Sequence, residues 1–425
     1  MKTTLVAFAL ILCFAGSSLS LDWQEARLQS GGKLVAVDTG EGGWVSVALA
    51  FPAGVAYCSE QASLAYLAAD IFGDNFLRNS LAEVGWSLEP RVEQDTALIL
   101  MSGPSEDLGS ILEPVLAVFG TRSAFDESDL AHARSSLKDD RDRWRSSPEA
   151  LLRSRMAKRL YGDHPYGQGV GRFDEEPIST ETLVEYLDHR YSPSGIQIVL
   201  AGDLDASATL RIWANAFYRL HGPQVSAADW PDPIPGSGRF ESEHPSRQNI
   251  LLMQLPGLPS DDPRAPLLAL AGGIIQLLCE TDIRDARLAR NVSVWYRFAA
   301  TGPSHLEVAL RDVVPDKMER VEAVLTVILQ RLRNGDFSQF AVISAKDRIL
   351  GRLENHSSRG SGPASQGLGA LQIWTAETAR QGLLMRGVRA SFQDSLLVGN
   401  VDTISAFASE HLPPEQTVLG ILRQE

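Results

Sequence analysis

The residues best suited to metal chemistry are scattered through this sequence. A helical metal motif needs two ligands about one turn apart, so that both side chains face the same ion. None of the eight histidines has a second histidine at that spacing. They are His132, His164, His189, His221, His244, His305, His356 and His411. The sequence therefore has no local histidine motif, and only a metal site assembled from distant histidines stays open.

Other catalytic motifs are also missing. There is no Gly-x-Ser-x-Gly nucleophile elbow and no phosphate-binding P-loop. One dense acidic group is interleaved with arginines: Asp139, Asp140, Arg141, Asp142 and Arg143. Alternating charges of this kind are typical of a solvated helix face with ion pairs, and we interpret the group in that way.

Composition bounds the classes of function. The chain has 425 residues, of which 44% are hydrophobic and 22% charged, which indicates a folded protein with two or more domains. The formal net charge of −14 disfavours nonspecific binding to nucleic acid or to an anionic membrane, because both require clustered Lys and Arg.

The N-terminus is predicted to be a signal peptide, residues 1–20. A short basic start precedes an apolar run over 5–15, and small residues then allow cleavage after Ser20. The run is too short for a membrane anchor, and Cys13 lies inside it rather than at a lipidation site. We therefore expect an exported, periplasmic protein with no membrane span after cleavage.

Two cysteines remain after that cleavage, Cys58 and Cys279. Export permits a disulfide between them, but we expect two buried free thiols. Two cysteines alone are too few for a thiolate zinc site.

The elements that would have to position a site can be predicted from periodicity. Residues 62–72 have apolar side chains at helical spacing with small residues between them, which predicts a buried helix, and 75–84 a shorter one. Strand pairs are expected at 28–38 with 44–51 and at 86–93 with 97–101. Residues 105–119 and the charged stretch 126–145 are expected to be helical.

The second half of the chain repeats this order of elements. Residues 401–414 mirror 178–193 as a capped helix and a proline turn, and 418–422 mirror the strand that begins at Ile196. This pattern predicts an α+β fold of two homologous two-layer α/β domains produced by internal duplication. We expect the N-terminal domain at 21–222, a proline-rich linker at 223–247 and the C-terminal domain at 248–425.

One run of residues resembles the insulinase (pitrilysin) metallopeptidase family. It comprises Tyr161-Gly-Asp-His-Pro-Tyr-Gly167, then Tyr191-Ser-Pro193, then Val199-Leu-Ala-Gly-Asp203. The likeness extends upstream through 81–85 and 93–96 and downstream into the second half. It implies two homologous domains that form half of a clamshell around a peptide chamber.

Active members of that family carry His-x-x-Glu-His on their first long helix, where both His bind zinc and the Glu activates water. In this sequence the two His positions fall on Ala65 and Ala69, and the Glu position falls on Ala68. The third-ligand position falls near Asp140. The resemblance therefore implies a degenerate motif, no catalytic residue, no metal ligand and no cofactor in this chain.

The family also holds its substrate peptide with an Arg and a Tyr from the second domain. Arg287 fits the Arg position, and the Tyr position falls on Val294, two residues before Tyr296. A two-residue offset keeps the same face of a strand, so Tyr296 could replace it. The other interpretation of Tyr296 is a packed strand aromatic.

Some family members work as pairs in which a zinc-less subunit completes the chamber of a zinc-bearing one. We expect this chain to be such a non-catalytic subunit, with a zinc-bearing homologous peptidase subunit and a peptide substrate as its partners. The alternative is a stand-alone periplasmic peptide-binding or scaffold protein. A third possibility, hydrolysis by this chain alone, would require catalytic groups that its degenerate motif lacks.

Overall fold

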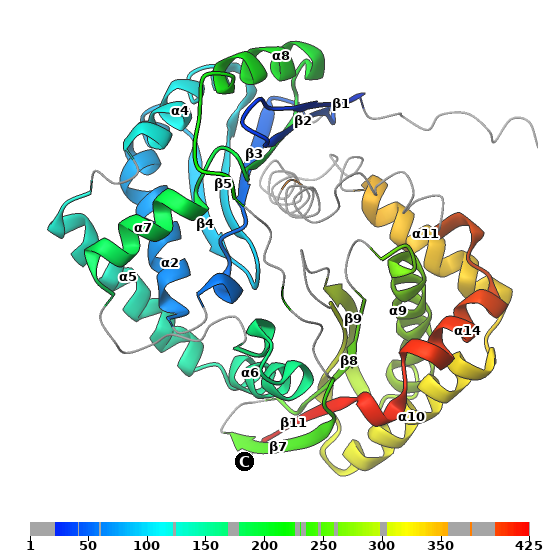
Figure 1. Ribbon diagram of the computed structural model, residues 1–425. Helices are drawn as coiled ribbons and strands as arrows, with labels where there is room; N and C mark the ends of the chain where they lie inside the picture. The colour runs from blue at the N-terminus through cyan, green and yellow to red at the C-terminus, as the bar shows by residue number, and fades with distance from the viewer. Residues whose placement is uncertain are drawn as a thin grey trace, which may run out of the picture.

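The computed structural model describes residues 22–40, 42–58, 61–121, 125–168, 178–225, 230, 235–244, 248–258, 262–297, 304–355, 375 and 396–424. The predicted signal peptide, residues 1–20, lies outside them. The described chain forms two α+β domains, each with one sheet and a layer of helices (Figure 1). This is the fold class that the sequence predicts.

The first domain is built on a six-stranded sheet. In spatial order its strands are β1 (Asp22–Arg27), β2 (Lys33–Asp38), β6 (Gln197–Gly202), β3 (Trp44–Phe51), β5 (Ala97–Pro104) and β4 (Ser87–Val92). The outer helices are α2 (Ser63–Asp70), α3 (Asn79–Glu83), α4 (Leu112–Thr121), α5 (Glu127–Arg145), α7 (Thr180–Arg190) and α8 (Ala206–Phe217). A π-helical segment, η2 (Ile71–Arg78), joins α2 to α3.

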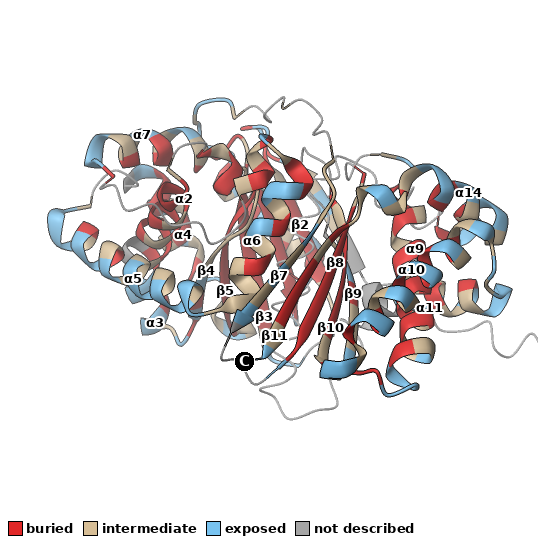
Figure 2. Ribbon diagram, turned by 90° about the horizontal axis from the view of Figure 1, so that it is seen from below, coloured by how far each residue is buried: buried red, intermediate tan, exposed pale blue. Residues whose placement is uncertain are grey.

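The second domain has a five-stranded sheet. In spatial order its strands are β7 (Gly238–His244), β11 (Val418–Gln424), β8 (Ile250–Pro256), β10 (His305–Val313) and β9 (Ala289–Arg297). Its helices are α9 (Ala265–Cys279) with a π-helical extension η5 (Glu280–Arg284), α10 (Met318–Asn334), α11 (Gln339–Asn355) and α14 (Val401–His411). Helix α9 is buried along its length, whereas α10, α11 and α14 carry exposed turns (Figure 2).

The two sheets share one topology. The order β2-β6-β3-β5-β4 corresponds to β7-β11-β8-β10-β9. In these two sets of five strands the first pair is parallel and every later pair is antiparallel. In each domain the middle strand of the set, β3 or β8, is followed in the chain by a helix that passes into a π-helical segment. These correspondences are consistent with an internal duplication.

Three local predictions need correction. Strands β2 and β3 are close in sequence but do not pair, because β6 lies between them and bonds to both. The two helices predicted at 62–72 and 75–84 are continuous through η2. The predicted linker 223–247 includes β7, which pairs with β11 at the edge of the second sheet.

The helix predicted from 105 begins later than expected. Ser105–Asp107 forms only a 3-10 turn, and α4 begins at Leu112 with Pro114 in its first turn. Proline is well tolerated there, because the first-turn N–H groups have no partner within the helix.

Helix α9 and η5 together, Ala265–Arg284, are long and apolar enough to cross a membrane by length and composition. In the described chain most of this segment is buried, and residues such as Leu268, Ala271 and Ile275 are in the core of the second domain. Its hydrophobicity is therefore that of a central core helix.

Helix α6 (Pro148–Tyr161) comes from the first half of the chain but covers the inner face of the second sheet. Its apolar side chains pack there against alternate residues of β8, β10 and β11. The contacting residues are Leu152, Met156, Leu160, Ile250, Leu252, Ala309, Val418 and Leu422. A Cβ atom at Gly420 would lie 2.4 Å from Met156 Sδ, so glycine at this position lets helix and sheet approach closely.

A buried ion pair fixes this helix to the sheet. Arg153 Nε and Nη2 on α6 donate to Glu307 Oε1 on β10 at 3.0 and 2.8 Å, and Gln254 Nε2 on β8 donates to Glu307 Oε2 at 2.9 Å. Burial alone would raise the pKa of Glu307, but the Arg153 guanidinium outweighs it and lowers that pKa. Beside this pair, Arg311 donates to Glu149 on α6 at 2.6 Å.

The Tyr161–Gly167 motif lies at the same junction. The Tyr161 hydroxyl is 2.8 Å from His305 Nδ1 on β10, and the Tyr166 hydroxyl donates to Asp95 Oδ2 at 2.7 Å. His164 and Trp230 pack edge to face against Tyr166. The motif that carries the family resemblance therefore connects the first domain to the second.

We predict that Arg153→Ala lowers the free energy of unfolding by about 3 kcal/mol, since it leaves a buried carboxylate without its guanidinium. Urea unfolding measures this. The double variant Arg153→Met with Glu307→Leu should recover most of the loss. Arg143→Ala is the control, because Arg143 pairs with Asp140 on the surface and is 77% exposed. A loss no larger than that of the control would contradict the prediction.

Candidate functional site

The degenerate zinc-motif positions lie on α2 and are enclosed in the core. Ala65 and Ala68 are 0% exposed and Ala69 is 1% exposed. Helix α2 packs against α5, α7 and the sheet, and methyl side chains allow these neighbours to approach closely.

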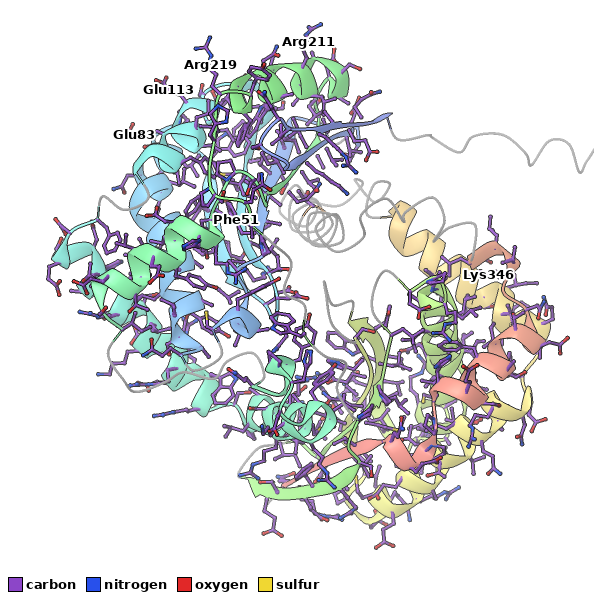
Figure 3. All side chains as sticks on the ribbon, in the orientation of Figure 1. Phe51, Glu83, Glu113, Arg211, Arg219 and Lys346 are labelled. Atoms are coloured by element: carbon purple, nitrogen blue, oxygen red, sulfur yellow. The ribbon has the colours of Figure 1, made fainter. Side chains whose placement is uncertain are left out.

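Aromatic rings complete the packing beside α2. Phe72 lies 5.2 Å from Phe51 and 4.8 Å from Tyr191, measured between ring centroids, and all three side chains are fully buried. Figure 3 shows Phe51 inside the first domain, whereas Glu83 and Arg211 lie at its outer surface. The helix is thus held by its apolar residues, and the methyl groups of Ala65 and Ala68 are part of the same core. Nearby Cys58, like Cys279 in the second domain, is buried and forms no disulfide among the described residues, as predicted.

The structure brings Asp140 into electrostatic range of Asp70, the residue after Ala69. Burial and, to a smaller extent, the neighbouring carboxylates of Asp74 and Asp140 together raise the pKa of Asp70 to about 7, against the opposing effects of a hydrogen bond with Ser136 and of the Arg78 guanidinium. Asp140 itself pairs with Arg143, and Arg141 lies near Asp142. This is the ion-paired helix face that the charge pattern predicts.

This arrangement does not fit a zinc ion. The methyl groups at Ala65, Ala68 and Ala69 have no lone pair to offer, and zinc sites in proteins use Cys, His, Asp or Glu. Among the residues that the structure describes, no three or more such side chains are placed to hold a metal ion. The donor set that zinc hydrolysis needs is therefore missing from this helix pair.

Arg287 occupies an unusual backbone position just before β9. It is exposed and has φ +55°, the left-handed conformation that favours glycine. The Leu288 N–H donates to Ile283 O and the Arg287 N–H to Arg284 O, which is the Schellman pattern that ends a helix. In the first domain Gly85, with φ +73°, makes the same pattern before β4.

Tyr296 lies at the other end of β9, so the structure does not bring it together with Arg287. At about 3.3 Å per residue, Ala289 and Tyr296 are about 23 Å apart along the strand. The ring of Tyr296 packs against the core of the second domain, and its hydroxyl donates to Leu258 O at 3.5 Å. The neighbouring Trp295, which is 42% exposed, points to the opposite face.

Sequence reasoning missed the polar residues of the inner sheet face. On β10, Leu306, Val308 and Leu310 belong to the core that faces the helices. Alternation therefore places Glu307 and Arg311 on the other face, beneath α6. That alternation was visible in the sequence, but their partner Arg153 lies 154 residues away and could not be inferred from it.

Comparisons with known proteins agree with this geometry. The family model "Peptidase M16 inactive domain" matches residues 177–349. No curated protein matches the chain.

Several solved structures share the fold. A peptidase M16 inactive domain from Pseudomonas fluorescens is 19% identical, with a TM-score of 0.74 over 95% of this chain and 98% of that one. A protease from Helicobacter pylori is 15% identical, with a TM-score of 0.73 over 95% and 99%. The first half of the periplasmic protease PqqL from Escherichia coli is 13% identical, with a TM-score of 0.70 over 95% and 92%.

The described fold has two α+β domains, and its helix α2 carries alanine at the positions that the sequence resemblance assigns to the zinc motif. Residues 177–349 match the model of the M16 peptidase inactive domain, and the described fold is similar to that of a solved M16 domain, in agreement with the insulinase-family resemblance of the sequence. The family prediction is confirmed.

We predict that Asp70→Asn removes a pH dependence of stability. Because the folded pKa of Asp70 is about 7 against an ordinary 3.8, the folded state holds a proton that the unfolded state has lost. Stability should therefore fall as pH rises from about 4 to about 7. The variant should lack this contribution and be more stable at pH 8 by up to about 4 kcal/mol, since each pKa unit of the shift corresponds to about 1.4 kcal/mol.

Urea unfolding from pH 4 to pH 8 measures this contribution. Asp139→Asn, at an exposed position of the neighbouring helix α5, is the matched control for a change in net charge. Equal pH profiles for the wild type and Asp70→Asn would contradict the assignment.

Proposed function

We propose that this chain is the non-catalytic subunit of an exported insulinase-type zinc peptidase, in which it completes the peptide chamber of a zinc-bearing homologous partner. The observation that carries the proposal is the three buried methyl groups of α2, at Ala65, Ala68 and Ala69. The fold around the catalytic helix is kept, while the groups that would bind zinc and activate water are replaced.

The arrangement of the domains supports a role as half of a chamber. The two domains form an arc, with their sheets toward its inner side and most of the helices outside (Figure 1). The buried Arg153–Glu307 pair fixes α6 of the first half to the second sheet, so the arc is held as one unit. A rigid half needs a second half to enclose a peptide. One structural relative, PqqL, is a periplasmic protease whose first half alone matches this chain in extent.

Substrate binding is the second part of the proposed role. Arg287 is exposed and keeps a left-handed backbone in which glycine would be more favourable. A side chain retained against a backbone preference suggests a functional contact, here with the peptide. Tyr296 contributes through its hydroxyl edge, since its ring is packed against the core.

Co-purification with a zinc-bearing homologue tests the partnership. We expect a stable complex that holds about one zinc per pair, with none in the isolated chain. The pair should cleave unfolded peptides in a chelator-sensitive manner, and the isolated chain should not. A monomer that binds peptides without a partner would favour the alternative, a stand-alone periplasmic peptide-binding or scaffold protein. Stoichiometric zinc in the isolated chain would overturn both.

The variant Arg287→Gly separates substrate binding from folding. We expect it to be at least as stable as the wild type, by up to about 1 kcal/mol, because glycine suits the left-handed position. We expect kcat/KM of the pair to fall about tenfold if the guanidinium holds the peptide, equivalent to about 1.4 kcal/mol. Tyr296→Phe in the same background tests the hydroxyl. Unchanged cleavage by the double variant would refute substrate contact while leaving the partnership intact.

A further inference from the structure

Strand β9 is an edge strand of the second sheet among the strands that the structure describes. It is 9 residues long, and among the described strands it pairs only with β10. An edge strand presents backbone N–H and C=O groups to which another chain can add. Natural proteins usually block such edges against the addition of another strand.

The side chain of Gln276 on α9 occupies the middle of this edge. The Val294 N–H donates to Gln276 Oε1 at 2.7 Å, and Gln276 Nε2 lies 3.3 Å from Val292 O. One residue of an added parallel strand would bridge the same two groups, a carbonyl and the N–H two residues further on. The amide of Gln276 therefore stands in for a peptide unit.

The orientation of this amide is determined by its partners. The Val294 N–H can only donate, and the carboxylate of Glu280 can only accept, so the Gln276 oxygen must face Val294. Gln276 Nε2 donates to Glu280 Oε1 at 2.7 Å. Arg348 on α11 holds that carboxylate with two hydrogen bonds of 3.0 Å. Gln276 itself is only 8% exposed.

Strand β4 is the corresponding edge in the first domain, and it is protected in another way. Pro90 lies within β4, opposite Ile99 of β5, and proline has no N–H to offer an added strand. The two domains thus block equivalent edges with different chemistry. This agreement favours a protective role for Gln276 over incidental bonding.

We infer that Gln276 closes the edge of β9 against strand addition, so that neither a second copy of this chain nor an extended peptide pairs with Val292–Val294. The inference does not depend on the proposed function. It implies that any peptide held by this chain is held through side chains or at another edge.

The test is Gln276→Leu, which keeps a similar volume and helix propensity but has no hydrogen-bonding groups. The probe is a fluorescent synthetic peptide that copies residues 304–313 and includes the β10 strand that already pairs with β9. We expect at least tenfold tighter binding of this peptide, or self-association at tenfold lower protein concentration in sedimentation. Hydrogen exchange at Val294 should become faster. Gln339→Leu, the same change at an exposed position of α11, controls for an added surface leucine.

If Gln276→Leu does not fold, Gln276→Asn provides the second variant, because its shorter amide cannot reach Val292 and Val294 together. A folded variant with faster exchange at Val294 but no gain in peptide binding or association would overturn the inference. Wild-type protein that binds the peptide as tightly as the variants would also overturn it.

Discussion

The arrangement of this molecule depends on the salt bridge between Arg153 and Glu307. The Glu307 side chain is only 3% exposed, and a carboxylate buried to that degree requires a charged partner. That partner comes from α6, which belongs to the first half of the chain. The carboxylate on the inner face of the second sheet therefore has its charged partner only when α6 of the first half is folded against that face. Apolar contacts of Leu152 and Met156 on the same helix add the burial that the ion pair itself does not provide.

The packing of α2 accommodates alanine at the positions that the sequence resemblance assigns to the zinc motif. Its contacts with the core run through Leu64, Leu67 and the ring of Phe72, and the methyl groups of Ala65 and Ala68 belong to the same buried cluster. Alanine at the motif positions costs little in a helix and fills less volume than His or Glu, so α5 and α7 can close over it. The next residue, Asp70, is polar, and its carboxyl has a raised pKa chiefly because it is buried, which the Arg78 guanidinium offsets only in part.

Elements that depend on local or repeated patterns could be predicted from the sequence. The pairing of strands and the packing of helices from distant parts of the chain could not. The helix around Ala65, the β4–β5 hairpin and the likeness of the two halves follow from short-range periodicity and capping. The insertion of β6 between β2 and β3 does not, because pairing partners in a sheet are chosen by the whole fold. The crossing of α6 to the other domain is hidden for the same reason. Alternation in β10 marks Glu307 as facing away from the core, but only the structure supplies Arg153.

The two proposed substrate residues, Arg287 and Tyr296, differ in whether the fold itself explains their presence. Gly85 and Arg287 occupy the same position of the same helix-ending motif in the two domains, which makes the first domain an internal reference for the second. Glycine adopts this left-handed conformation without strain, whereas arginine there lowers the stability of the fold by about 1 kcal/mol. Because Arg287 is exposed, packing of its side chain does not offset this loss. Tyr296, by contrast, is explained by its contact with the core. Arg287 is therefore the stronger candidate for a peptide contact, although the sequence alone proposed Arg287 and Tyr296 equally.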